Sequence, residues 1–201
     1  MTHSRNLLTL SLIATFVATL TACGGGGSTT GASSIVKGVA ATGAAIDKGS
    51  VTLACTTAST APVSTASDGS YSVDVSHMTL PCVARVDYTE STGKPARLHS
   101  LVRTTGTVNI NPLTDMIVAD LSSTGLASDV QPADVKAFTE DRIRTSTQLV
   151  KTELTSKGVS TAFLPEDVIG SKMTAASGSG KGDDYDAVLD RMAEKTTLKT
   201  F

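Results

Sequence analysis

Two histidines are the first candidates for chemistry in this chain. His77 and His99 lie well beyond the apolar N-terminal segment. A histidine held by an aspartate could activate a Ser or Thr nucleophile, so a periplasmic hydrolase using His77 or His99 is one hypothesis. The G-x-S-x-G turn that often carries such a serine is absent from the sequence. His99 shares strand parity with Arg97 and Arg103, so we expect it on a solvent-facing sheet surface and His77 in an exposed turn.

A glycine-rich loop and an acidic cluster near the C-terminus could bind phosphate or metal. Residues 178–182 read GSGKG, but a phosphate-binding loop requires Gly where Ala175 stands and Ser or Thr where Gly182 stands. Four carboxylates follow, and Ca²⁺ takes six to eight oxygen ligands. Their spacing is not that of an EF-hand, and acidic residues stabilise the first turn of a helix. We interpret them as a helix start and expect no metal and no cofactor. The four residues are Asp183, Asp184, Asp186 and Asp190.

The composition predicts a folded protein and excludes one class of partner. The chain has 201 residues, 17 Lys+Arg, 19 Asp+Glu and a net charge of −2, with 40% hydrophobic residues. That hydrophobic fraction is sufficient for a folded core. Without a basic excess, and with four Phe, three Tyr and no Trp, the chain lacks the charge and the stacking surfaces of a nucleic-acid binder. We expect no nucleic-acid partner.

The N-terminus indicates secretion. Residues 7–20 form an apolar stretch that follows Arg5 and is too short for a permanent spanning helix. The next residues, LTAC ending at Cys23, resemble the lipobox of bacterial lipoproteins. The resemblance implies a signal peptide over residues 1–22, cleavage before Cys23, and diacylglycerol and palmitate on that cysteine. The alternative is an ordinary signal peptide cut near Ala22.

Lipidation would place the protein at a membrane without a spanning helix. Several acyl chains on one cysteine hold a protein stably at a bilayer. Gly24 stands where Asp would favour the inner membrane in lipoprotein sorting, so the resemblance implies the outer membrane of the cell envelope. The expected partners are the membrane, through the lipid, and an envelope protein of unknown identity. Residues 23–34 comprise the lipidated cysteine and a flexible Gly/Ser linker.

The spacing of apolar residues divides the rest of the chain into two segments. Residues 35–110 alternate apolar and polar side chains in short runs separated by turn residues, which predicts about seven strands and a small β-sandwich. Residues 111–201 predict a helical module. Asn111 and Pro112 open its first helix, and a second helix runs from Pro132 to Lys157, with Gly158 as terminator. The last helix covers residues 183–194.

Cys55 and Cys82 are the cysteines that remain if Cys23 is lipidated. An even number in an oxidising compartment favours a disulfide. Each has the strand parity of inward-facing apolar residues, so we expect the two to face each other across the sandwich core. The bridge would close a loop of about 28 residues. The alternative is a pair of buried free thiols.

Parts of the strand-rich segment resemble the carboxypeptidase regulatory-like domain. The matching residues are 36–38 (VKG), 43–46 (GAAI), 49–53 (GSVTL) and 67–73 (SDGSYSV), and residues 109–115 (NINPLTD) resemble a group of proteobacterial lipoproteins. The resemblance implies an Ig-like, transthyretin-like sandwich that is used for scaffolding or contact and carries no catalytic residue. We therefore expect a lipid-anchored envelope protein with a structural or protein-contact role, and the hydrolase remains the alternative.

Overall fold

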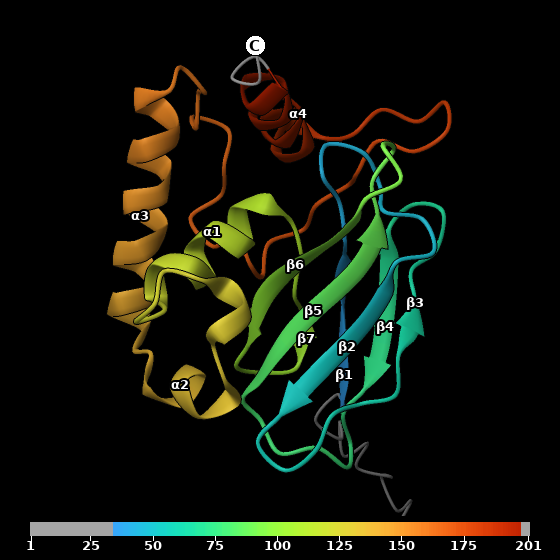
Figure 1. Cartoon of the computed structure of the whole chain (residues 1–201), viewed down its shortest axis with the longest axis vertical. Coiled ribbons are helices and arrows are strands. Elements are labelled where there is room, and N and C mark those ends of the chain that lie inside the picture. The colour runs from blue at the N-terminus through green and yellow to red at the C-terminus, as the bar shows by residue number, and fades with distance from the viewer. Residues whose placement is uncertain (1–33, 198–201) are drawn as a thin grey trace, which may run out of the picture. The chain divides into compact units, whose positions relative to one another are not determined.

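The computed structural model describes residues 34–197 (Figure 1). The predicted signal peptide, Cys23 and the linker up to residue 33 lie outside the described residues. Seven strands between residues 35 and 107 form two sheets, and the helices follow them in the chain. One sheet has the order β4 (Ser70–Asp74), β1 (Ile35–Val39), β7 (Gly106–Thr107); the other has the order β3 (Val63–Ser64), β2 (Ser50–Cys55), β5 (Cys82–Thr89), β6 (Pro95–Val102).

The two sheets share a hydrophobic core. Alternate residues of β2 and β4 are buried, as the period-two pattern predicts. Tyr71, the first inward residue after the Asp68–Gly69 turn, donates a hydrogen bond from its hydroxyl to the Val108 carbonyl at 2.6 Å. This bond ties β4 to the segment that follows β7. The core members from both sheets include Val36, Val51, Leu53, Tyr71, Val73, Val86, Leu98 and Val102.

The helices build a second core against the other face of the four-stranded sheet. Val83 of β5 and Leu101 of β6 contribute from the sheet, and every α-helix contributes side chains. Figure 1 shows α1 between α3 and strands β5 and β6. The predicted boundary between residues 110 and 111 runs through one compact unit. The helical elements are α1 (Pro112–Leu121), the short 3-10 helix η1 (Ala127–Asp129), α2 (Pro132–Ala137), α3 (Glu140–Ser156) and α4 (Asp184–Thr197).

The predicted helix from Pro132 to Lys157 is wrong as a single element. Phe138 has extended backbone angles, which end α2, and the Thr139 side chain accepts a hydrogen bond from Arg142 N at 3.2 Å to start α3. Phe138 turns into the helical core, where it is buried. The predicted terminator Gly158 is confirmed, because its φ of +79° is in the left-handed region that glycine favours.

The Cys55–Cys82 disulfide is present, but its predicted position is wrong. The two residues are direct partners in the antiparallel pairing of β2 and β5, so the bridge joins neighbouring strands of one sheet. The sequence-based expectation placed it between the two sheets. Strand parity showed correctly that both side chains face the core, but parity alone does not tell which strands are neighbours.

Candidate functional site

Residues 109–115 form a polar junction between the sheets, α1 and the C-terminal segment. The Asn109 side chain accepts a hydrogen bond from Val39 N of β1 at 3.3 Å and donates one to the Ser171 carbonyl at 2.7 Å. Its backbone N–H donates to the Ile169 carbonyl at 2.8 Å. One buried side chain thus connects the first strand with the chain that leads to α4.

Asn111 caps α1, as the sequence predicts. Its side chain accepts a hydrogen bond from Thr114 N, and the Thr114 hydroxyl accepts one from Asn111 N, both at 3.0 Å. The Asn111 amide also donates to the Tyr185 hydroxyl of α4 at 3.1 Å, and that hydroxyl donates to the Val168 carbonyl at 2.7 Å. The helix cap is therefore also a link between α1 and α4.

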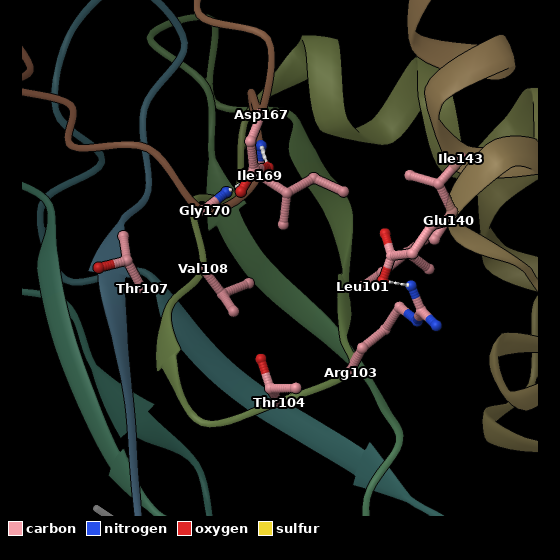
Figure 2. A pocket seen from close by; sticks show the side chains of 10 residues that line it. All are labelled: Leu101, Arg103, Thr104, Thr107, Val108, Glu140, Ile143, Asp167, Ile169 and Gly170. Carbon is pink, nitrogen blue, oxygen red and sulfur yellow. Dashed lines mark hydrogen bonds and ion pairs between the residues drawn. The ribbon is translucent and has the colours of Figure 1, made fainter.

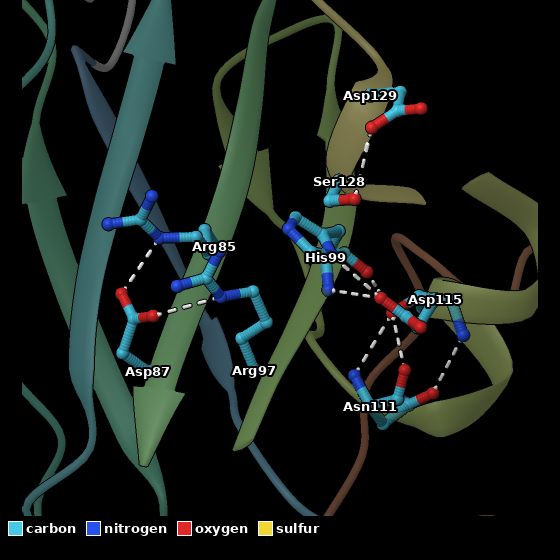
Figure 3. Close-up of polar contacts among 9 residues, drawn as sticks. Arg85, Asp87, Arg97, His99, Asn111, Asp115, Ser128 and Asp129 are labelled. Atoms are coloured by element: carbon cyan, nitrogen blue, oxygen red, sulfur yellow. Dashed lines mark hydrogen bonds and ion pairs between the residues drawn. The ribbon is translucent and has the colours of Figure 1, made fainter. Parts of the chain in front are cut away.

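His99 is buried, so its expected position on a solvent-facing surface is wrong. It has the strand parity of Arg97 and Arg103, but α1 covers this face of β6 at His99 and leaves it 6% exposed. Asp115 of α1 accepts hydrogen bonds from the His99 backbone N–H at 2.9 Å and pairs with its Nδ1 at 2.8 Å (Figure 3). The sheet and α1 are joined through this His–Asp pair.

The His99–Asp115 pair supplies two members of a hydrolytic triad, and no hydrogen bond among the described residues joins a Ser or Thr hydroxyl to the His99 ring. The Thr114 hydroxyl lies 2.9 Å from the carbonyls of His99 and Asn111, as a donor to backbone. Ser100 has the opposite strand parity and faces away from the imidazole. His77 is exposed in the turn after β4, as predicted. We therefore interpret the pair as a structural link between the sheet and α1.

An ion-pair cluster lies beside His99 on the same sheet face. Asp87 of β5 pairs with Arg85 at 2.7 Å and with Arg97 at 3.3 Å (Figure 3). Arg85 is the direct cross-strand partner of His99, and Asp87 that of Arg97. Because the arginine side chains are about half exposed, these pairs contribute little to stability. This partly exposed cluster lies next to the buried His99 on the same sheet face.

A trough with an apolar floor lies where β6, β7 and α3 meet residues 167–170 (Figure 2). Its first part encloses about 160 Å³. Arg103, which directly follows β6, and Glu140 of α3 form an ion pair across it. The floor consists of four aliphatic side chains, namely Leu101, Val108, Ile143 and Ile169.

The trough continues along α3. A second hollow of about 300 Å³ shares Glu140, Ile143, Asp167 and Ile169 with the first and extends to Gln148. Its far wall is residues 166–169, which run beside α3. Two turns of helix therefore form one side of the trough, from Glu140 to Gln148.

Hydrogen bonds fix both walls of the trough. The Lys151 ammonium donates to the Pro165 carbonyl at 2.7 Å and holds the chain against α3. Burial lowers the pKa of Lys151, and nearby Glu166 partly opposes that shift. Asp167 accepts hydrogen bonds from the backbone N–H groups of Ile169 at 3.1 Å and Gly170 at 2.8 Å, which shapes the turn at the trough's edge.

Some charged residues on the trough's rim form ion pairs and others do not. Arg103 is paired with Glu140, and Arg144 with Asp141. Glu166 and Asp167 have no basic ion-pair partner within the described residues. Sequence reasoning missed the trough, because its lining comes from three segments that are far apart in the chain. Glu166, which lies near Lys151, and Asp167 therefore leave negative charge on the rim that is not held in an ion pair.

The acidic cluster at α4 opens the helix, as predicted. Asp183 accepts hydrogen bonds from Asp186 N at 3.0 Å and Thr174 N at 2.7 Å, which caps the helix and fixes the preceding loop. Asp186 is buried, and that burial raises its pKa to about 6. Within residues 34–197, no group of three or more His, Cys, Asp or Glu is arranged to hold a metal ion.

No family model, no curated protein and no solved structure matches the chain. Among the described helices, none has both the length and the apolar character needed to cross a bilayer.

Proposed function

We propose that this protein is a lipoprotein of the cell envelope, anchored by lipid on Cys23 in the outer membrane, and that its folded body makes a protein contact without catalysis. The support for the anchor is the sequence over residues 1–23. The two sheets contain seven strands in total and share one hydrophobic core. This arrangement supports a carboxypeptidase regulatory-like, transthyretin-like sandwich. The linker would hold this body away from the bilayer.

The observation that carries the contact role is the trough. An open groove with an aliphatic floor and a charged rim is suited to an extended polypeptide, whose alternate side chains can be buried while its charges remain at the rim. Glu166 and Asp167 carry negative charge without a basic ion-pair partner in the described region. We infer that the partner segment carries apolar side chains and at least one Lys or Arg.

A photocrosslinking amino acid at Gln148 tests this contact in cells. Gln148 lines the trough, whereas its neighbour Leu149 is 56% exposed and does not. We expect the Gln148 position to give an adduct with one envelope protein and the Leu149 position to give none. Glu166→Lys reverses a rim charge and should reduce the adduct several-fold. No adduct from Gln148, or equal adducts from both positions, would contradict a contact through the trough.

A further inference from the structure

Asp186 is an unusual carboxylate in the described part of the chain. It lies in the first turn of α4, and only 1% of the residue is exposed. Its Oδ2 accepts a hydrogen bond from Ala176 N at 2.9 Å, but its buried Oδ1 has no hydrogen-bond partner. An ionised carboxylate with an unpartnered buried oxygen is costly, whereas a protonated carboxyl loses much less on burial.

The groups around Asp186 add to that cost. Asp183 and Asp190, three residues before it and four after it, repel a charge on Asp186. Asp186 contacts residues 174–182, and residues 42–45 in turn contact Ala176 and Asp190. These two segments contain one charged side chain, Lys181, which is exposed and forms no ion pair with a described residue. Burial together with this repulsion raises the pKa of Asp186 to about 6, although the Ala176 N–H opposes the shift.

Ala176 connects Asp186 to the β1–β2 connection. Its carbonyl accepts a hydrogen bond from Ala45 N in the β1–β2 connection at 2.9 Å, while its N–H donates to Asp186. Gly182 permits this approach, because a Cβ there would lie 2.0 Å from Asp186 Oδ2. The two hydrogen bonds form a chain from the β1–β2 connection through the loop to α4.

We propose that Asp186 is a proton-operated latch that holds residues 174–183 and the start of α4 against the β1–β2 connection when protonated and loosens them when ionised. In the closed arrangement the proton removes the repulsion from Asp183 and Asp190. On opening, the carboxylate gains water and separates from the loop. Acidification therefore closes the latch, and a rise toward neutral pH favours opening.

The size of the effect follows from linkage. The pKa of Asp186 is raised in the closed fold to about 6, and water would return it to its ordinary value of 3.8 on opening. Opening therefore releases a proton over the interval between these values and becomes more favourable as pH rises through it. Between pH 5 and pH 7.5 the open population should rise about tenfold.

Hydrogen exchange of the Ala176 amide in the full chain measures that opening. After correction for the intrinsic rate, we expect its protection factor to fall about tenfold from pH 5 to pH 7.5. Asp186→Asn should make the protection factor independent of pH. Asp184→Asn, on an exposed residue of the same helical turn, should retain the wild-type dependence. A pH-independent wild-type protein, or an unchanged dependence in Asp186→Asn, would overturn the latch.

A second variant keeps the proposal testable if Asp186→Asn fails to fold. Asp190→Asn removes one repelling carboxylate and leaves Asp186 in place. The midpoint of the pH dependence should then move to lower pH, because less repulsion leaves the carboxyl easier to ionise. A midpoint that stays in place or rises would contradict the assignment of the proton to Asp186.

Discussion

At the scale of single residues, buried polar groups connect the sheets with the helices. Asp115 binds both the backbone and the ring of His99, and Asn109 binds both β1 and the segment before α4. Buried polar groups without partners are destabilising, so such connections fix one arrangement of the elements. His99 has this connecting role and is not a surface residue.

Replacing Asp115 should therefore reduce stability. Asp115→Ala leaves the His99 backbone N–H and Nδ1 without their acceptor, and we expect the free energy of unfolding to fall by about 1–3 kcal/mol. Urea denaturation followed by circular dichroism measures this loss. His77→Ala, in an exposed turn, is the matched control and should change stability by less than about 0.5 kcal/mol. Equal effects of the two variants would contradict the connecting role.

At the scale of elements, a local signal sets the start of α1, whereas a tertiary contact sets the approach of β1 to the chain after β7. The Asn111 cap is readable from sequence, because a cap residue followed by Pro favours a helix start. The need for glycine at position 38 of β1 arises instead from a tertiary contact. A Cβ at that position would lie 1.7 Å from the Val108 carbonyl oxygen, which also accepts the Tyr71 hydroxyl bond. Glycine is needed where these segments touch.

The two helix caps should differ in their contributions. Asn111→Ala removes a cap and the hydrogen bond to Tyr185, and we expect a loss of about 2 kcal/mol. Thr139→Ala removes only the cap of α3 and should cost about 1 kcal/mol. Chemical denaturation of both variants gives the comparison. A smaller loss for Asn111→Ala than for Thr139→Ala would show that the link to α4 contributes nothing.

Gly38→Ala tests the close approach of β1. The added methyl group must displace the backbone at Val108, and overpacking of this kind costs about 3 kcal/mol. Gly93→Ala is a useful comparison, since a Cβ there meets no atom within 4 Å and the cost is limited to its φ of +80°. Thermal unfolding should show the larger drop for Gly38→Ala, and the reverse order would refute the packing argument.

The sequence predicted those features that depend on neighbouring residues in the chain. Strand alternation, the turn at Asp68–Gly69 and the cap at Asn111 are of this kind. The burial of His99 and the break after Phe138 depend on α1 and α2 packing against residues distant in the sequence. The trough and the unpartnered oxygen of Asp186 are likewise products of tertiary contact, so no local pattern indicates them.

At the scale of the whole molecule, two hydrophobic cores share the four-stranded sheet. One core lies between the sheets and the other beneath the helices, so β5 and β6 are covered on both faces along part of their length. The disulfide between β2 and β5 strengthens this central sheet. Loss of the sheet would remove support from both cores, and we expect the body to unfold as one cooperative unit.

Removing the disulfide should destabilise the whole body. The bridge spans 27 residues, and cross-links of this length contribute about 3 kcal/mol by restricting the unfolded chain. Cys55→Ala/Cys82→Ala should lower the urea midpoint while leaving a single transition. Reductant should have the same effect on wild type and none on the variant. An unchanged midpoint would contradict the contribution assigned to the bridge.

Labelling with radioactive palmitate, combined with membrane fractionation, tests the lipid anchor most directly. We expect the wild-type protein to be labelled and to sediment with the outer membrane. Cys23→Ser should abolish the label and either leave an uncleaved precursor or release the protein into the soluble fraction. A wild-type protein without label, or a Cys23→Ser protein that is processed and fractionates as wild type, would contradict the anchor.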